Sequence, residues 1–169
     1  MRTRIPTALA ASACVLLLAL TATACGDDGP PEAGDQKGVA DFLQQNVGCQ
    51  DVDYYSADDL SEIQEQINGL DGGGVCDQEN GDIDFLHVTD MKGFAQSVAA
   101  QDGGDNSLMI GQDFAVDAGR DERVDKLLKA GLFLLDCDPG MQIPDGYHRE
   151  DVGDGCVATD YRKDSGSDE

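Results

Sequence analysis

The chain has 169 residues, of which 34 are acidic and 11 are Lys or Arg, so its formal net charge is −23 at pH 7. Such a charge repels nucleic acid, whose binding requires Lys and Arg to neutralise phosphates, and it repels anionic lipid headgroups in the same way. A nucleic-acid partner is therefore excluded, and any attachment to a membrane must come from something other than surface charge. The length fits a single domain.

The first 24 residues have the pattern of a secretory signal peptide. Arg2 and Arg4 precede a compact apolar stretch over residues 8–20, and Ala22-Thr23-Ala24 provides the small residues of a cleavage site. The apolar stretch is shorter than the roughly 20 residues that a membrane-spanning helix needs. We therefore expect residues 1–24 to be removed on export, and the loss of Arg2 and Arg4 then brings the formal charge to −25.

The residues before Cys25, Ala22-Thr23-Ala24, resemble the lipobox of bacterial lipoproteins. In that family the cysteine is lipidated through a thioether and becomes the first residue of the mature protein. The resemblance implies that Cys25 carries acyl chains such as palmitate, which would hold the protein on the extracytoplasmic face of the cell membrane. Ala22 stands where the family usually has a larger aliphatic residue, so cleavage by an ordinary signal peptidase, leaving Cys25 as a thiol, is the alternative.

The number of cysteines favours lipidation of Cys25. Once Cys14 has left with the signal peptide, five cysteines remain, and an odd number is unusual in an exported protein. Without Cys25 the other four can pair completely, in one of three ways. Disulfides are favoured over a zinc site because no Cys-x-x-Cys occurs. Since each pair would close a local loop, the expected disulfides are Cys49–Cys76 and Cys137–Cys156.

Composition divides the mature chain into three parts. Residues 25–37 are acidic and rich in Gly and Pro, which is typical of a flexible tether. Residues 38–160 are expected to form one domain, and residues 161–169 a disordered tail.

In the first half of the domain, apolar residues at helical spacing predict a helix over residues 38–48 that ends at Gly48. A short extended segment, residues 49–55, follows. A second helix is expected to begin at Ser56 as its N-cap and to be ended by residues 71–74, Asp-Gly-Gly-Gly. Asn80-Gly81 lies between two strand-like stretches and predicts a hairpin with a two-residue type I′ turn.

The second half continues with a helix over residues 91–101 and one strand over residues 107–116, in which apolar residues alternate. A charged helix is expected over residues 120–130. Residues 131–135 fit either a strand or a continuation of that helix, and the chain after Asp136 is expected to be irregular. His87, on a predicted strand, is interpreted as a surface or partly buried side chain rather than a general base.

This order of elements predicts an α+β domain of two layers, in which a small, mostly antiparallel sheet is covered by helices and stapled by two disulfides. The segment Gly111-Gln112-Asp113-Phe114-Ala115-Val116, followed by a charged helix, is similar to a pattern in small exported actinobacterial lipoproteins of uncharacterised function. That resemblance implies a location rather than an activity.

Acidic clusters suggest calcium, but neither residues 102–106 nor the run that begins at Asp136 has the ligand spacing of an EF-hand. No Gly-x-Ser-x-Gly motif or phosphate-binding glycine loop is present, and no catalytic residue is assigned. The weak calcium candidates are Asp136, Asp138, Asp145, Asp151 and Asp154.

We therefore expect a non-enzymatic binding or accessory module at the cell surface, without a cofactor, whose partner is a cell-surface protein or a small ligand. One alternative is a calcium- or cation-binding surface protein that uses the acidic loop over residues 136–156. The other is a small hydrolase without a recognisable motif.

Overall fold

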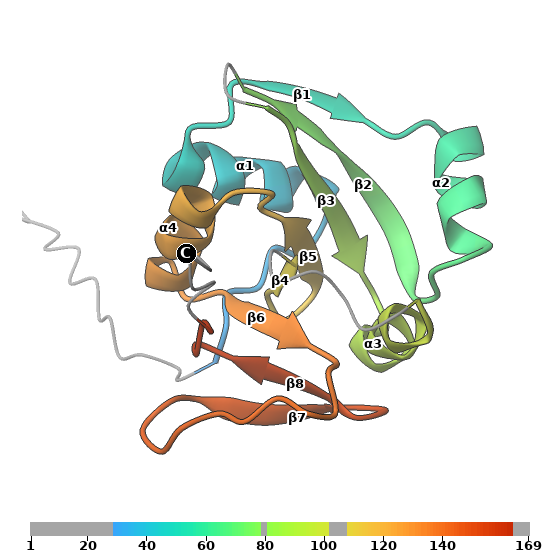
Figure 1. Ribbon diagram of the computed structural model, residues 1–169. Helices are drawn as coiled ribbons and strands as arrows, with labels where there is room; N and C mark the ends of the chain where they lie inside the picture. Colours follow the sequence, from blue (N-terminus) through green and yellow to red (C-terminus); the bar gives the residue numbers. More distant parts are fainter. Residues whose placement is uncertain (1–28, 79–80, 102–107, 164–169) are drawn as a thin grey trace, which may run out of the picture.

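The computed structural model describes residues 29–78, 81–101 and 108–163. These residues form one antiparallel sheet of eight strands, in the order β1-β2-β3-β5-β4-β6-β8-β7, with four helices (Figure 1), which confirms the predicted α+β class. Among the described residues, no helix is both long enough and apolar enough to cross a membrane. The elements are α1 (Gln36–Val47), β1 (Asp51–Tyr54), α2 (Ala57–Gln64), β2 (Leu70–Asp77), β3 (Ile83–Val88), α3 (Met91–Ala100), β4 (Leu108–Ile110), β5 (Phe114–Asp117), α4 (Asp121–Lys129), β6 (Phe133–Asp136), β7 (Arg149–Gly153) and β8 (Cys156–Thr159).

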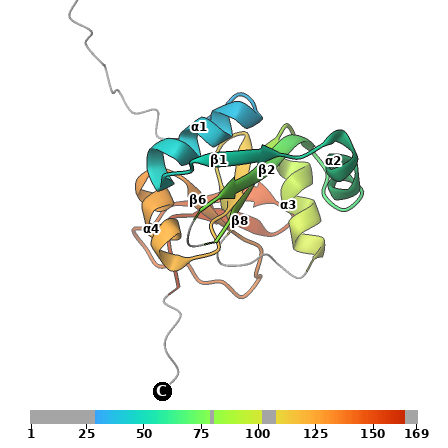
Figure 2. The ribbon, with the colours of Figure 1, turned by 90° about the horizontal axis from the view of Figure 1, so that it is seen from above.

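Helices lie on both faces of the sheet, so the domain has three layers and the expectation of two was wrong. Figure 2 shows α1 and α4 on one side of the strands and α2 and α3 on the other. Successive strand residues point to opposite faces, and here both faces are apolar: Phe85 packs under α1 and α4, whereas its neighbour Leu86 packs on the other side. Strands that are buried on both faces lose the simple alternation of a two-layer domain.

We call the α1/α4 side the closed face. Helix α1 begins where the Asp35 side chain accepts a hydrogen bond from the Gly38 N–H (2.7 Å), and it ends at Gly48, whose φ of 80° fits the predicted glycine cap. The Cys49–Cys76 disulfide then ties the end of α1 to β2, as predicted. The core of this face consists of Val39, Ala40, Leu43, Cys49, Cys76, Ile83, Phe85, Met109, Phe114, Val116, Ala118, Val124, Leu127, Leu132 and Leu134.

We call the α2/α3 side the open face. Helix α2 begins at Ser56 with a capping box to Asp59, which confirms the predicted N-cap. The Cys137–Cys156 disulfide belongs to this side of the sheet, again as predicted. The buried core here consists of Leu70, Val88, Phe94, Ala95, Val98, Ile110, Ala115, Leu135, Cys137, Cys156 and Ala158.

The glycines expected to end the second helix lie inside strand β2 instead. Helix α2 stops at Gln64, and β2 already begins at Leu70. A Cβ on Gly72 would lie 2.7 Å from the Gln36 Oε1, and one on Gly73 would lie 2.7 Å from the Phe85 carbonyl oxygen. The backbone of β3 therefore restricts position 73 to glycine, whereas position 72 meets only the Gln36 side chain, and neither glycine forms a turn.

The predicted β2–β3 hairpin is confirmed, but its loop is longer than the two residues expected. The last paired residues are Cys76 and Ile83, and the Gly81 N–H donates to the Gln78 carbonyl (3.0 Å) within the loop. Asn80 lies outside the described residues.

The strand expected over residues 107–116 is in fact the hairpin of β4 and β5. Ile110 pairs with Ala115, and the Gly111 N–H donates to the Phe114 carbonyl (2.8 Å). A Cβ on Gly111 would lie 2.2 Å from the Phe114 ring, so the turn needs glycine there. Because apolar residues continue to alternate across this turn, the sequence pattern alone predicts one strand instead of two.

Of residues 131–135, the last three belong to strand β6 (Phe133–Asp136), which decides for a strand over a continued helix. The segment expected to be irregular contains the hairpin of β7 and β8. Its turn is formed by Gly153, Asp154 and Gly155, whose φ values are 108°, 54° and 85°. Left-handed residues in succession suit glycine and tolerate Asp. The glycine content that suggested irregular chain marks this turn instead.

Candidate functional site

A cleft of about 520 Å³ opens at one end of the open face. Its volume lies in the range of about 300–1,000 Å³ that is typical of small-molecule sites. The walls come from the start of α3, the β4–β5 turn, strands β6, β8 and β7, and the segment before α1. The lining residues are Gly29, Pro30, Met91, Lys92, Ile110, Gly111, Gln112, Phe133, Glu150, Asp151, Val152 and Ala158.

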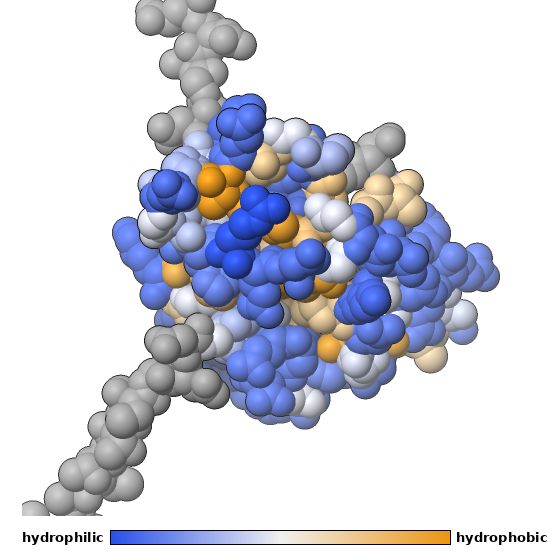
Figure 3. Space-filling view, turned by 90° about the horizontal axis from the view of Figure 1, so that it is seen from below, coloured by the Kyte–Doolittle hydropathy of each residue, from blue (hydrophilic) through white to orange (hydrophobic). Residues whose placement is uncertain are grey.

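The lining of the cleft is apolar at depth and polar at the surface. Ile110 and Ala158 are each only 3% exposed, and Phe133 is half-buried beside them. The exposed polar residues Lys92, Gln112, Glu150 and Asp151 also line the cleft. An apolar interior with a few polar groups is the usual composition of a ligand site. Figure 3 shows the molecule from the side of β7, where separate apolar patches lie between hydrophilic residues.

One wall of the cleft is held by a ring stack. His148 stacks on Phe133 with ring centroids 4.1 Å apart and an angle of 4° between the planes. Backbone contacts fix His148 in turn: its N–H donates to Asp160 (2.6 Å), and its carbonyl accepts from the Thr159 hydroxyl (2.7 Å). The His148 Nε2 lies 3.6 Å from a carboxylate oxygen of Glu150. Phe133 is therefore a fixed apolar surface beside a carboxylate.

The opposite wall includes residues 29–34, which we call the N-terminal strap. Gln112 binds it through two bonds: its backbone N–H donates to the Pro31 carbonyl (2.9 Å), and its Nε2 donates to the Pro30 carbonyl (2.8 Å). The tether expected over residues 25–37 is therefore too long, because its second part has partners on the domain and α1 already begins at Gln36.

Asp113 fastens the end of the strap. Its carboxylate accepts from the Ala33 N–H (2.7 Å) and the Gly34 N–H (2.6 Å). Two adjacent amides on one carboxylate make charge-assisted hydrogen bonds, which are stronger than neutral ones. Gln112 and Asp113, in the turn between β4 and β5, thus hold the strap at four points.

His87 lies behind Asp113 and is buried, with 8% of its surface exposed. Its Nδ1 contacts the carboxylate of Asp71, and its Nε2 lies 3.5 Å from the Asp113 Oδ2. Asp71 reaches His87 because it is the extra residue of a β-bulge, between the pairs Leu70–Val88 and Gly72–His87. Both ring nitrogens face carboxylates, so the geometry makes His87 a positioning residue for Asp113.

Sequence reasoning placed His87 at the surface or partly buried and did not link it to Asp71 or Asp113. Residues 71, 87 and 113 come from three different strand ends. Only the bulge at Asp71 and the unrecognised β4–β5 turn bring them together. The one signal that could have located the site is Gly111-Gln112-Asp113, a turn sequence inside an apolar segment.

The calcium candidates do not form a site. Among residues 29–78, 81–101 and 108–163, no three His, Cys, Asp or Glu side chains are grouped so that they could hold a metal ion. Instead, Asp136, Asp138 and Asp151 each accept a hydrogen bond from a backbone N–H two residues later, at 2.7–2.8 Å. The other candidate cluster, residues 102–106, lies outside the described residues.

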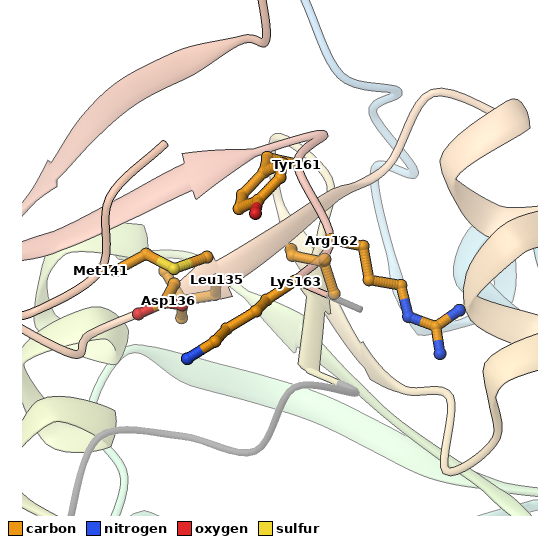
Figure 4. A pocket seen from close by; sticks show the side chains of 7 residues that line it. Leu135, Asp136, Met141, Tyr161, Arg162 and Lys163 are labelled. Atoms are coloured by element: carbon orange, nitrogen blue, oxygen red, sulfur yellow. The ribbon is translucent and has the colours of Figure 1, made fainter. Parts of the chain in front are cut away.

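A second pocket, between β6 and the last described residues, is too small for a ligand. Its volume is about 20 Å³, which is room for about one water molecule. Figure 4 shows Tyr161, Met141 and Lys163 around it, while Arg162 extends away toward α4, where it pairs with Asp121 and Asp125. Residues 161–163 are thus packed on the domain although a disordered tail was expected from residue 161; residues 164–169 lie outside the described part.

Comparisons with known proteins do not assign this chain to a family. No protein-family model matches the chain, and neither the curated proteins nor the solved structures contain a match.

Proposed function

We propose that this protein is a lipid-anchored, non-enzymatic binding module on the extracytoplasmic face of the cell membrane, and that the cleft binds a small molecule. The cleft carries the proposal, because it combines ligand-sized volume with an apolar interior and a polar rim. Support for a binding role over catalysis comes from His87, whose ring nitrogens both face carboxylates.

The position of the cleft relative to Cys25 supports a role near the membrane. Gly29 and Pro30 line the cleft, and Cys25 is only four residues before Gly29. Four residues span at most about 14 Å. A lipid on Cys25 would therefore keep the cleft close to the membrane surface, where molecules released from or delivered to the membrane pass.

Binding in the cleft can be tested with a neutral fluorescent apolar probe, N-phenyl-1-naphthylamine, and a variant that fills the cleft. Val152 is half-buried on the edge strand β7 and lines the cleft. We expect Val152→Trp to lower probe affinity at least tenfold. The matched control is Val52→Trp, at a half-buried valine on the other edge strand, β1, and it should bind like the wild type. Equal affinity in all three proteins would refute a ligand site in the cleft.

The anchor is tested separately by the intact mass of protein extracted from membranes with detergent. A thioether-linked lipid on Cys25 adds the mass of its acyl chains to a chain that begins at that residue. A chain that begins at an unmodified Cys25 would refute the anchor and leave the binding proposal untouched. Cys25→Ala should move the protein from the membrane fraction to the medium or wash.

A further inference from the structure

The charges around the cleft select among small molecules. Glu150 and Asp151 are adjacent on β7, both are exposed, and both line the cleft. One oxygen of Asp151 accepts from the Gly153 N–H (2.8 Å), which fixes the carboxylate and leaves its second oxygen available for a ligand. The only cation among the lining residues is Lys92. The lining therefore carries two negative charges against one positive charge.

The apolar part of a ligand would lie against the interior of the cleft. Ile110 and Ala158 are buried there, and the Phe133 ring is held in place by its stack on His148. Phe133 and Glu150 both line the cleft, and His148 links them: its ring stacks on Phe133, and its Nε2 lies 3.6 Å from a Glu150 carboxylate oxygen. A ligand with an apolar body and a positive group can thus place the body on Phe133 and the charge on the carboxylates.

The charge of the whole protein acts in the same direction. A formal net charge of −23 raises the local concentration of cations and lowers that of anions near the surface. Lys92 opposes this only locally, and its aliphatic stem lies against β7: a Cβ on Gly153 would be 3.3 Å from the Lys92 Cγ. No carboxylate of the described residues lies within 4.0 Å of its ammonium group.

We infer that the ligand is an organic amine, with an apolar body that fills the interior of the cleft and a protonated amino group bound by Glu150 and Asp151. This inference rests on the proposed function, because it names the class of molecule for the same cleft. Charge-assisted hydrogen bonds from the ammonium group to the two carboxylates supply the selectivity.

The test uses three probes with the same apolar body: 4-phenylbutylamine, 4-phenylbutanol and 4-phenylbutyrate. Their affinities for the full chain are measured at pH 7 by displacement of N-phenyl-1-naphthylamine. We expect the amine to bind at least tenfold more tightly than the alcohol, and the carboxylate to bind more weakly than the alcohol. The preference for the amine should shrink at high salt, because ions screen exposed charges.

Variants locate the source of the preference. Glu150→Gln with Asp151→Asn should bring the affinity for the amine to within about threefold of that for the alcohol. The matched control is Asp51→Asn with Asp53→Asn, which removes two exposed charges from the other edge strand and should preserve the preference. Lys92→Met should tighten binding of the amine about twofold to threefold.

The outcomes separate the two proposals. If the three probes bind equally, or if the carboxylate binds best, the cleft is a ligand site but the amine class is wrong. If both double variants lose the preference equally, the overall charge selects the ligand and the role of Glu150 and Asp151 is refuted. If none of the probes binds, the proposed function fails and the amine class fails with it.

Discussion

The two faces of the sheet are covered to different degrees, and the cleft lies on the less tightly covered face. On the closed face α1 and α4 touch each other as well as the strands, and most core side chains there have no exposed surface. On the open face α2 packs on β2 without a buried residue of its own, whereas α3 packs on β7 and β8 with four buried residues. The cleft opens beside the start of α3, over strands β6, β8 and β7, and so lies away from α2 and β2.

The largest expected effect comes from truncating one phenylalanine on each face. Phe114 has no exposed surface and lies 5.3 Å from the Phe42 ring on the closed face. Phe114→Ala should lower the free energy of unfolding by about 3–5 kcal/mol, since it leaves a closed cavity. Phe133→Ala should lower the free energy of unfolding by less, about 1–2 kcal/mol, because the space that the ring leaves is open to the cleft. Urea unfolding measures both; equal losses would contradict the difference between the faces.

The disulfides provide the next test, because each face has one. They close loops with sequence separations of 27 and 19 residues. In the chain-entropy description these loops contribute about 3.5 and 3.2 kcal/mol, so the two double Cys→Ser variants should be destabilised almost equally.

The same variants should differ in ligand binding. Cys156 begins β8, which carries the cleft residue Ala158, whereas Cys49 and Cys76 belong to the closed face. Replacing Cys137 and Cys156 should weaken binding of N-phenyl-1-naphthylamine, and replacing Cys49 and Cys76 should leave it unchanged in conditions where both variants are folded. Equal weakening would show that the cleft depends on both faces.

The sequence predicts elements whose signals are local. The Gly48 cap, the Ser56 N-cap, the β2–β3 hairpin and helix α3 each depend on a few neighbouring residues, and the structure confirms them. Loop closure also favoured the two disulfides that form. The third layer was missed because strands with two buried faces bury successive residues, such as Phe114, Ala115 and Val116 in β5, and so lose the alternation that marks a single buried face.

The candidate site was much less predictable. Its walls come from one helix, four strands, the β4–β5 turn and the strap, which are far apart in the sequence. The cleft brings together Lys92, Phe133 and Glu150 because the β7–β8 hairpin packs next to α3. The Gly-rich sequence of that hairpin suggested irregular chain, so the sequence did not predict it. The bulge at Asp71, which reaches His87, depends on pairing across strands that local sequence does not determine.

A smaller effect is expected at Asp113, which holds the strap against the β4–β5 turn. Asp113→Asn keeps one oxygen acceptor but removes the negative charge of the carboxylate to which two backbone N–H groups donate. It should therefore lower the free energy of unfolding by about 1–2 kcal/mol. Amide hydrogen exchange at Ala33 and Gly34 should accelerate, while exchange within α4 on the closed face should change only with global stability. Asp51→Asn, at an exposed carboxylate of β1, is the matched control, and faster exchange of the strap in that variant would argue against a local role of Asp113.

The smallest effect concerns Tyr55, which joins β1 to α2, the helix without buried residues. Burial, followed by the hydrogen bond from its hydroxyl to Asp84 (2.8 Å), raises the pKa of Tyr55 above its usual value of 10.0. Above about pH 10 the unfolded chain releases this proton while the folded chain keeps it, so the free energy of unfolding must fall as the pH rises.

Tyr55→Phe should therefore reduce stability slightly at pH 7, through loss of the bond to Asp84, and should also flatten the decline between pH 10 and pH 12. Tyr54→Phe, at the exposed neighbour, serves as the matched control and should keep the wild-type slope. Urea unfolding at several alkaline pH values measures the two slopes. An unchanged slope in Tyr55→Phe would mean that the alkaline loss arises elsewhere, and that the junction between β1 and α2 is as loosely held as α2 itself.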